Sequence, residues 1–274
     1  MKNHPKNLIL ISIDSLRADA IAANPDKRLL ARYKLKRKPK TPVLDSLAKG
    51  GIFFNDCTTA APYTTAAHAA ILTGQWPWHN GVKSIFRERL KTQTLFSVLK
   101  KEGFAVLWQT DYPLLLGRPL NLAQGADKFV ERDENESFKW LAGQKGRRLA
   151  CFFHFSDIHF PYGFSGQDLH SQDNLRKKIK QLAEKHRVSA GVSGKKNRYL
   201  VFGKKTGEEQ VLMQAYMEVI EKLHRLGRHS EIMDLYMEGV SRFDEGRFKI
   251  FWERLKKIGL LKNSLVVVIG DHGE

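Results

Sequence analysis

Two aspartates and a histidine stand directly after apolar runs near opposite ends of the chain. Asp14 follows residues 7–13 (NLILISI), and Asp271 and His272 follow residues 264–270 (SLVVVIG). Carboxylates and imidazoles bind divalent metal ions when rigid elements bring them together. One aspartate after a strand often caps the following helix. Two such strand ends favour a metal site over capping, so the pattern predicts that Asp14, Asp271 and His272 bind one divalent cation.

A hydroxyl and a histidine mark residues 61–74 (APYTTAAHAAILTG). Thr64 stands where an alanine-rich helix is predicted to begin, and the backbone N–H groups and dipole at that end favour negative charge. His68 follows four residues later and shares a helical face with Thr64. Thr64 taken alone is better explained as an N-cap. The same position would also stabilise a threonine alkoxide, which makes Thr64 a candidate nucleophile.

A third group of polar residues follows the apolar run of residues 149–155. Asp157 and His159 face the same way if the chain stays extended, and Pro161 then ends the segment. Asp157 and His159 are therefore candidate substrate-binding residues. His154 lies within the apolar run and is predicted to be a buried histidine with satisfied hydrogen bonds rather than a ligand.

The elements that must position these residues alternate between strands and helices, which indicates an α/β fold with a mostly parallel sheet. Ligands of such sheets bind at the carboxyl ends of the strands, where Asp14 and Asp271 are expected. The pattern predicts helices that start at Thr41-Pro42 and Thr64, and an amphipathic one over 92–102. A long helical pattern covers 232–258. The predicted strands cover residues 7–13, 52–58, 104–109, 149–155 and 264–270.

The length of 274 residues allows one large α/β domain or two smaller ones. No apolar run approaches the ~18 residues that span a bilayer. The run over 7–13 is too short for a signal peptide and ends in an acid, so a cytoplasmic protein is expected. Cys57 and Cys151 both fall in strand-like runs and are predicted to be inert core thiols rather than a disulfide.

The formal net charge of +17 is high. Residues 27–40 hold eight Lys or Arg and no acid, and more basic residues lie along 176–205. Such a field attracts anionic substrates, acidic polysaccharides, phospholipid headgroups or nucleic acid, although a solvated basic surface explains it equally well. Residues 165–235 are polar, basic and helix-favouring, with a Gly/Ser/Lys loop at 189–196. They are predicted to form an insertion beside the sheet or a cap over the site.

Taken in order, these segments resemble the sulfatase group of the alkaline phosphatase superfamily. In that family a nucleophile is followed four residues later by a basic residue and then by Thr-Gly. Counting back from Thr73-Gly74 puts the basic residue at His68 and the nucleophile at Thr64. The other matching segments are the opening strand with Asp14, residues 41–48 and 51–54 before the nucleophile, the substrate-facing histidine at His159-Phe160-Pro161-Tyr162, and the strand over 260–274 with the second metal pair.

The resemblance implies an alkaline-phosphatase-like three-layer sandwich with helices on both faces of the sheet. It also implies that Thr64 completes the metal ligands, and that His68 and His159 contact the substrate or assist catalysis. Thr64 stands where formylglycine sulfatases have the cysteine that they mature, so no formylglycine is expected. Asp271-His272 in place of asparagine-type ligation favours zinc or manganese, with calcium possible. The 274 residues are expected to be the N-terminal portion of a catalytic domain whose C-terminal subdomain is absent.

The expected activity is metal-dependent hydrolysis of a sulfate ester, in a small molecule or polysaccharide, with Thr64 as nucleophile. Phosphate mono- or diester hydrolysis, or phospho-transfer, is the first alternative, because a threonine ester cannot expel sulfate by elimination and must be cleaved at sulfur or phosphorus. A catalytically inactive fragment is the second alternative. Binding to nucleic acid or an acidic polymer is not expected to be the main function, and the sequence leaves the oligomeric state open.

Overall fold

The computed structural model describes residues 6–35, 38–162, 173–187 and 207–273. The chain divides into two compact units. The first consists of residues 1–18, 52–156 and 246–274, and the second of residues 19–51 and 157–245. The first unit contains both predicted metal-binding strand ends and the predicted nucleophile, so it holds most of the candidate site.

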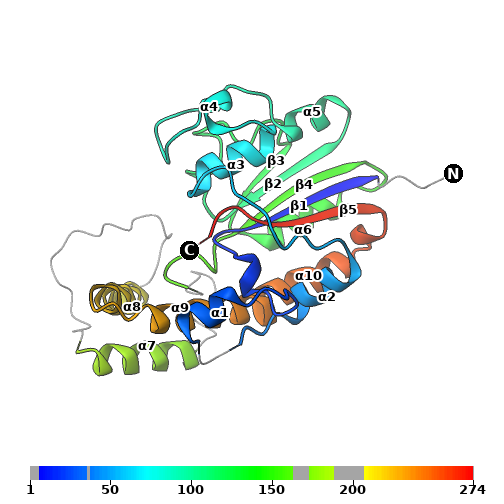
Figure 1. The fold of residues 1–274 in the computed structure, drawn as a ribbon. Helices are drawn as coiled ribbons and strands as arrows, with labels where there is room; N and C mark the ends of the chain where they lie inside the picture. The colour runs from blue at the N-terminus through cyan, green and yellow to red at the C-terminus, as the bar shows by residue number, and fades with distance from the viewer. Residues whose placement is uncertain (1–5, 36–37, 163–172, 188–206, 274) are drawn as a thin grey trace. The chain divides into compact units, whose positions relative to one another are not determined.

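A parallel sheet forms the centre of the first unit (Figure 1). The described strands follow the order β3-β2-β4-β1-β5, and every neighbouring pair is parallel. The apolar runs predicted as strands are buried in β2 and β4, as is usual when both faces of a parallel sheet are covered. The α/β prediction is therefore confirmed. The strands are β1 (Asn7–Ile13), β2 (Ala105–Thr110), β3 (Lys128–Glu131), β4 (Leu149–Phe155) and β5 (Ser264–Gly270).

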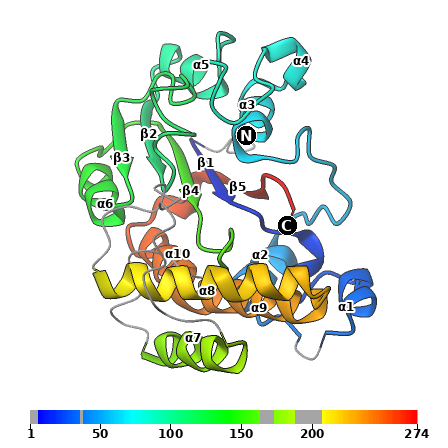
Figure 2. The same ribbon diagram turned by 90° about the vertical axis from the view of Figure 1, so that its left-hand side faces the viewer.

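Helices cover both faces of this sheet (Figures 1 and 2). On one face, Phe152 of β4 contacts the ring of Phe96, which belongs to α5. On the other face, Phe153 contacts the ring of Phe251, which belongs to α10. Because successive side chains of a strand point to opposite faces, these contacts place α5 and α10 in different layers. The helices of this unit are α3 (Thr64–Thr73), α4 (Pro77–Asn80), α5 (Leu95–Lys101), α6 (Glu134–Ala142) and α10 (Lys249–Lys257).

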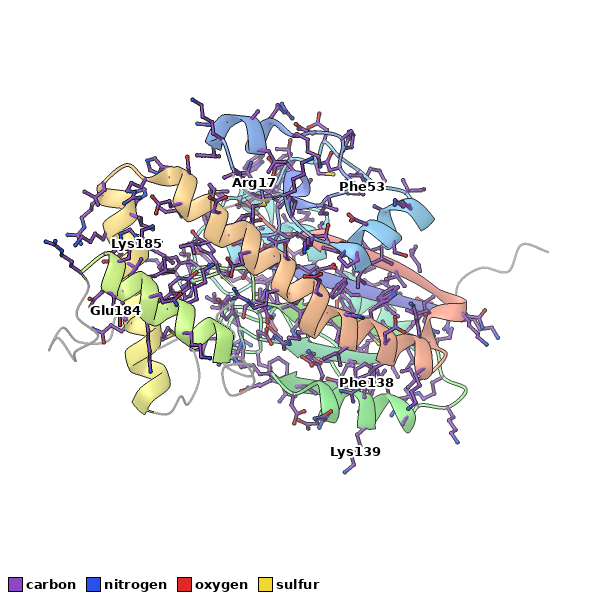
Figure 3. All side chains as sticks on the ribbon, turned by 90° about the horizontal axis from the view of Figure 1, so that it is seen from below. Arg17, Phe53, Phe138, Lys139, Glu184 and Lys185 are labelled. Carbon is purple, nitrogen blue, oxygen red and sulfur yellow. The ribbon has the colours of Figure 1, made fainter. Side chains whose placement is uncertain are left out.

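Helix α6 and strand β3 are short elements that the sequence pattern did not reveal. Asp133 begins α6 by accepting a hydrogen bond from the Glu136 N–H at 3.1 Å, which is an N-cap. Phe138 is buried and Lys139 is exposed, so the helix turns one face to the core; Figure 3 shows Lys139 projecting outward. The polar composition of this segment concealed a helix with a narrow apolar face.

The strand predicted over residues 52–58 is wrong. This described segment is irregular, and Ile52 and Phe54 are 85% and 69% exposed. A β-strand needs a hydrogen-bonded neighbour, and the sheet order of the described strands does not include these residues. Cys57 is consequently exposed rather than part of the core, whereas Cys151 is buried in β4 as predicted.

The second unit is helical. Its helix α8 packs against α7 and α9, and α1 also contacts α9 (Figure 2). Asp244 follows α9 and accepts hydrogen bonds from the Val43 and Leu44 N–H groups at 2.9 and 3.0 Å, so it caps α2 from a distant part of the chain. The helices are α1 (Arg28–Tyr33), α2 (Pro42–Gly50), α7 (Asp173–Lys185), α8 (Gly207–Arg225) and α9 (His229–Phe243).

The long helical pattern predicted over 232–258 is divided by a π-helical turn at Asp244–Phe248, which separates α9 from α10. Helices α7 and α8 lie within the basic range 165–235. The Gly/Ser/Lys loop at 189–196 and much of the basic stretch 176–205 lie outside the described residues. The insertion or cap over 165–235 stays a prediction. Across the described part of the chain, every helix is too short or too polar to cross a membrane.

Candidate metal and nucleophile site

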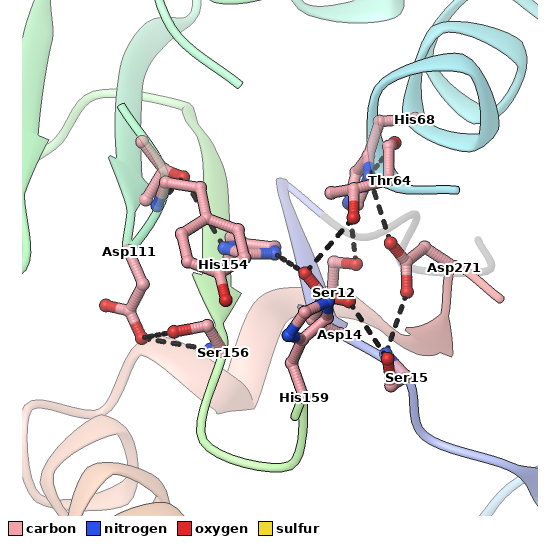
Figure 4. Close-up of polar contacts among 12 residues, drawn as sticks. Ser12, Asp14, Ser15, Thr64, His68, Asp111, His154, Ser156, His159 and Asp271 are labelled. Carbon is pink, nitrogen blue, oxygen red and sulfur yellow. Dashed lines mark hydrogen bonds and ion pairs between the residues drawn. The ribbon is translucent and has the colours of Figure 1, made fainter. Parts of the chain in front are cut away.

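The first and last strands deliver the predicted metal ligands to one edge of the sheet. β1 and β5 pair in parallel with Ile13 opposite Gly270, so the residues that follow each strand are neighbours. Asp14, Asp271 and His272 each offer one donor atom, and these atoms lie within 4.8 Å of one another. The geometry therefore brings together the three residues that the sequence singled out. Figure 4 shows two of them, Asp14 and Asp271, beside Thr64.

Two backbone features allow this close approach. A Cβ atom on Gly270 would lie 2.1 Å from the Leu16 carbonyl oxygen, so only glycine fits where β5 meets the turn after β1. Ser15 adopts a left-handed backbone with φ of 61°. In this conformation the Ser15 N–H donates to Asp271 Oδ1 at 3.1 Å. The His272 N–H donates to the same oxygen at 2.9 Å, so Oδ1 is held by the backbone.

The second oxygen of Asp271 has a different environment. Oδ2 is buried and accepts no hydrogen bond from the described residues. It lies 3.5 Å from His68 Nδ1 and 3.6 Å from His272 Nε2. Burial, together with the nearby charge of Asp14, raises the pKa of the Asp271 carboxyl to about 6. Two buried carboxylates that disfavour one another, beside an imidazole, fit a divalent cation, which would satisfy the orphaned oxygen.

The Thr64 hydroxyl lies against this cluster. Thr64 Oγ1 is 3.4 Å from Asp14 Oδ2 and 3.2 Å from His272 Nε2. The N-cap of α3 is Tyr63, in an extended conformation, so Thr64 is the first residue inside the helix rather than its cap. The capping alternative therefore does not explain Thr64. Its hydroxyl instead faces the predicted metal ligands at the positive end of the helix dipole.

His68 is engaged at both ring nitrogens. Nδ1 lies 2.7 Å from the Thr64 carbonyl oxygen, which can only accept a hydrogen bond, so Nδ1 carries the proton. Nε2 then accepts a hydrogen bond from Ser12 Oγ at 2.8 Å. Burial lowers the pKa of His68 to about 3, so the ring is neutral. These contacts tie α3 to β1, and they give no support to the predicted catalytic and substrate-binding roles of His68.

His154 is a site residue that the sequence interpretation missed. It is buried, as predicted, but it pairs with Ser12 in the β1–β4 register and faces the cluster. His154 Nε2 lies 3.3 Å from Asp14 Oδ2, and Nδ1 lies 3.4 Å from Thr110 Oγ1. A histidine in an apolar strand looks like a core residue until the neighbouring strand is known. The strand order β4-β1-β5 places it beside Asp14, one of the predicted metal ligands.

A buried ion-pair network holds the neighbouring strand ends. Arg247 donates to both oxygens of Asp111, at 2.7 and 3.0 Å, and its Nε donates to Glu134 at 2.8 Å. Asp111 Oδ2 also accepts from the Ser156 N–H at 3.0 Å, which joins the segments after β2 and β4. Burial alone would raise the pKa of Asp111, but the charge and hydrogen bonds of Arg247 hold that pKa below its ordinary value. This network keeps the edge of the sheet beside His154 rigid.

Asp157 and His159 follow β4 and belong to the second unit. Asp157 is buried, and His159 is half-buried with Nδ1 3.0 Å from the Phe160 carbonyl oxygen. The predicted contact of these two side chains with substrate stays a prediction.

Comparisons with known proteins bear on the family and the fold. The family model described as sulfatase matches residues 6–143, which is half of the chain. The chain belongs to the sulfatase family. Among curated protein sequences, none matches this one.

Solved structures of sulfatases and of other alkaline phosphatase superfamily members share the fold. The protein BT4656, solved with its substrate D-glucosamine-2-N,6-O-disulfate, is 18% identical with a TM-score of 0.63; the match covers 98% of this chain and 66% of that one. A phosphonate monoester hydrolase of Agrobacterium radiobacter is 16% identical with a TM-score of 0.54; the match covers 99% of this chain and 63% of that one.

An alkaline phosphatase superfamily protein from Vibrio parahaemolyticus is 14% identical with a TM-score of 0.52; the match covers 100% of this chain and 56% of that one. This sulfatase-family chain thus spans between about half and two thirds of the length of these structures. The likeness establishes the alkaline-phosphatase-like fold of the chain.

Proposed function

We propose that this chain acts as a metal-dependent hydrolase that cleaves a sulfate ester, with Thr64 as nucleophile. The observation that carries the proposal is the position of Thr64 Oγ1, within 3.4 Å of Asp14 and 3.2 Å of His272 at the start of α3. Asp14, Asp271 and His272 are the proposed metal ligands, with Thr64 completing them. The Asp/His donor set favours zinc or manganese over calcium.

A bound divalent cation supplies Lewis-acid chemistry, which lowers the pKa of a nearby hydroxyl and neutralises charge on ester oxygens. Thr64 Oγ1 gives its proton to a solvent water and attacks the ester sulfur in line with the leaving oxygen. The new Oγ1–sulfur bond replaces the bond to the leaving alcohol, which takes up a proton. The first turn of α3 offers backbone N–H groups to the sulfuryl oxygens.

Water then attacks the threonyl sulfate at sulfur and releases Thr64 and inorganic sulfate. His68 positions Thr64 through its hydrogen bond to the Thr64 carbonyl, since neither ring nitrogen is available for proton transfer. His159 stays the proposed group for contact with the anion or protonation of the leaving oxygen.

The structural relatives support an anionic ester as substrate. BT4656 was solved with a sulfated glucosamine as its substrate, which favours a sulfated sugar for this chain. The phosphonate monoester hydrolase shows that the same fold also serves phosphorus chemistry. Because a threonine ester must be cleaved at sulfur or phosphorus, hydrolysis or transfer at phosphorus is the second candidate.

Turnover of 4-nitrophenyl sulfate and 4-nitrophenyl phosphate, with and without added Zn²⁺ or Mn²⁺, tests the proposal. Thr64→Ala is expected to lose at least ~10³-fold in kcat, because the covalent step disappears. Thr64→Ser keeps the hydroxyl and is expected to stay within about tenfold of the wild type. Thr73→Ala is the matched control, since Thr73 lies in the same helix and bonds only to the Ala69 carbonyl and Gln75 N–H among the described contacts.

A metal-dependent rate that Thr64→Ala retains would overturn the assignment of the nucleophile. A wild-type rate no higher than that of Thr64→Ala, on either ester and with either metal, would favour the inactive fragment. Faster turnover of the phosphate ester would select the second candidate.

A further inference from the structure

Two tryptophans are exposed on the turn that follows the nucleophile helix. Trp76 and Trp78 are 48% and 59% exposed, which is unusual for the residue with the largest apolar surface. Their rings stack on one another with centroids 5.0 Å apart and an interplanar angle of 5°. They flank Pro77, which is buried, so both indoles project to the same side of the chain. The two rings lie one over the other, so each offers a flat outer face to a ligand, and the mechanism does not use this pair.

The turn that carries this pair is rigid. Asn80 is buried, and its amide donates to the Gln75 carbonyl at 2.9 Å while its side-chain oxygen accepts from the Val82 N–H at 2.9 Å. The His79 ring also packs edge-on against Trp78. A binding surface that is already ordered loses little conformational entropy when a ligand arrives. The tryptophans are therefore held in place rather than displayed on a loose loop.

The same segment is bonded to both residues that flank the nucleophile. Tyr63 Oη donates to the Lys83 carbonyl, and Thr65 Oγ1 donates to the Ile85 carbonyl at 2.9 Å. Tyr63 and Thr65 are the neighbours of Thr64 on either side. These two hydrogen bonds hold residues 75–91 beside the start of α3, and Figure 1 shows α4 next to α3. A molecule bound along this segment would therefore lie beside the residues that flank Thr64.

Positive charge accompanies the aromatic surface. Residues 75–91 contain four Lys or Arg (Lys83, Arg87, Arg89 and Lys91) and one carboxylate, Glu88. All four cations are exposed. The carboxylate is taken up locally, because Glu88 accepts hydrogen bonds from the Ser84 N–H and hydroxyl. Flat aromatic faces bind the apolar face of a pyranose ring, and exposed cations bind its anionic substituents.

We propose that residues 75–91 form an accessory binding surface for a sulfated oligosaccharide, on which Trp76 and Trp78 stack against sugar units away from the cleaved ester. Lys83 and Arg87 meet further sulfate groups of the same chain. An anionic lipid surface would use the same residue types, but mutually stacked rings present a flat face rather than separate side chains that insert among acyl chains. The inference rests on the proposed function for the direction of the chain toward Thr64, whereas its test measures binding without turnover.

The test uses a chondroitin sulfate hexasaccharide as the probe and the unsulfated chondroitin hexasaccharide as its counterpart. Isothermal titration in the Thr64→Ala background gives the Kd without hydrolysis. Trp76→Ala combined with Trp78→Ala is expected to raise the Kd for the sulfated probe about tenfold or more, as truncation of aromatic anchors does at other binding sites. The double variant with Trp76→Phe and Trp78→Phe keeps flat rings, so its Kd for the sulfated probe is expected to rise less than that of the double alanine variant.

A second pair of variants separates a local effect from the net charge. Arg87→Ala and Lys139→Ala each remove one exposed cation, but Lys139 lies on α6 across the sheet from α3. Only Arg87→Ala is expected to weaken binding, by about threefold to tenfold. The rate on 4-nitrophenyl sulfate should be the same in the tryptophan variants and the wild type. If the wild type lacks that rate, the proposed function fails while the binding result still stands.

An unchanged Kd in both tryptophan variants would overturn the inference. So would equal affinity for the sulfated and unsulfated hexasaccharides, or equal losses in Arg87→Ala and Lys139→Ala. Co-sedimentation with phosphatidylserine vesicles that depends on the tryptophans, without any hexasaccharide binding, would assign the surface to a membrane instead. In the folded wild type, quenching of tryptophan emission by the sulfated probe alone provides an independent measurement.

Discussion

The substitution Gly270→Ala tests whether the close contact between β5 and the turn after β1 builds the site. The added Cβ would lie 2.1 Å from the Leu16 carbonyl oxygen, whereas a carbon–oxygen contact needs ~3.3 Å. The two segments must therefore separate by about 1 Å. Overpacking of this kind costs about 1–3 kcal/mol in a well-packed core. For a protein of this size, that cost predicts a Tm lower by roughly 2–10 °C.

The same displacement would move Asp271, one of the proposed metal ligands. Asp271 follows Gly270 directly, and its Oδ1 is held by the Ser15 N–H in the turn that would move. We therefore expect weaker binding of Zn²⁺, and a fall of ~10²-fold in the rate on 4-nitrophenyl sulfate, because a misplacement near 1 Å costs about that much. The assays are thermal unfolding, Zn²⁺ titration followed by calorimetry, and steady-state kinetics.

Gly246→Ala is the matched control. Gly246 is helical with a negative φ, and a Cβ there meets nothing within 4 Å among the described atoms, so alanine should be neutral or slightly stabilising. Equal Tm values and equal Zn²⁺ affinities for the Gly270→Ala and Gly246→Ala variants would refute the reasoning. A lower Tm with unchanged Zn²⁺ affinity would show that the contact stabilises the fold without positioning Asp271.

Three further predictions concern buried groups of the first unit. Because the pKa of Asp271 rises from 3.8 to about 6 on folding, its stabilising contribution is complete below about pH 4 and lost as the pH rises through 6. Between pH 4 and 7, the free energy of unfolding of the metal-free wild type should therefore fall by up to about 3 kcal/mol relative to that of the Asp271→Asn variant. Urea unfolding measures both free energies, and the same pH dependence in the two proteins would contradict this prediction. Burial raises the pKa of Cys151 to about 12, so a thiol reagent should titrate exposed Cys57 in the native protein and both cysteines after unfolding. His154→Ala should weaken Zn²⁺ binding by roughly 10–100-fold, because His154 lies 3.3 Å from Asp14 and orients its carboxylate. His79→Ala, which removes an exposed histidine, is the control, and equal Zn²⁺ affinities of the two variants would contradict this role of His154.

The residues proposed as metal ligands could be recognised together because their positions follow from local rules. An apolar run that ends in an aspartate identifies a strand and its carboxyl end, and parallel strands bring those ends together. β1 and β5 pair in parallel, with Asp14 and Asp271 just beyond the paired residues. Thr64 was recognisable from the family resemblance, because counting back from Thr73-Gly74 through the family's motif puts the basic residue at His68 and the nucleophile at Thr64.

His154 could not be interpreted because its role depends on a non-local fact. Its side chain faces Asp14 only because β4 lies next to β1, with His154 opposite Ser12. Strand order is set by packing of the whole sheet and leaves no mark near a single residue. The segment 52–58 failed for the same reason: its apolar residues favour a strand, yet in the structure they have no strand beside them. Arg247 was missed because its partner Asp111 lies far away in the sequence.

The electrostatics of the cluster connect metal binding to folding. Asp14 and Asp271 are buried at 0% and 1% exposure, and Asp271 Oδ2 accepts no hydrogen bond within the described structure. A buried carboxylate oxygen without a hydrogen bond destabilises a fold, and a second carboxylate beside it adds repulsion. A cation that binds the folded cluster and not the unfolded chain removes both costs, so its binding free energy adds to the stability. Zn²⁺ or Mn²⁺ should therefore raise the Tm of the wild type in proportion to the logarithm of its concentration, and Asp14→Asn should abolish that dependence. If the Tm of the wild type did not respond to either ion, the carboxylate pair would have to be stabilised by something other than a metal.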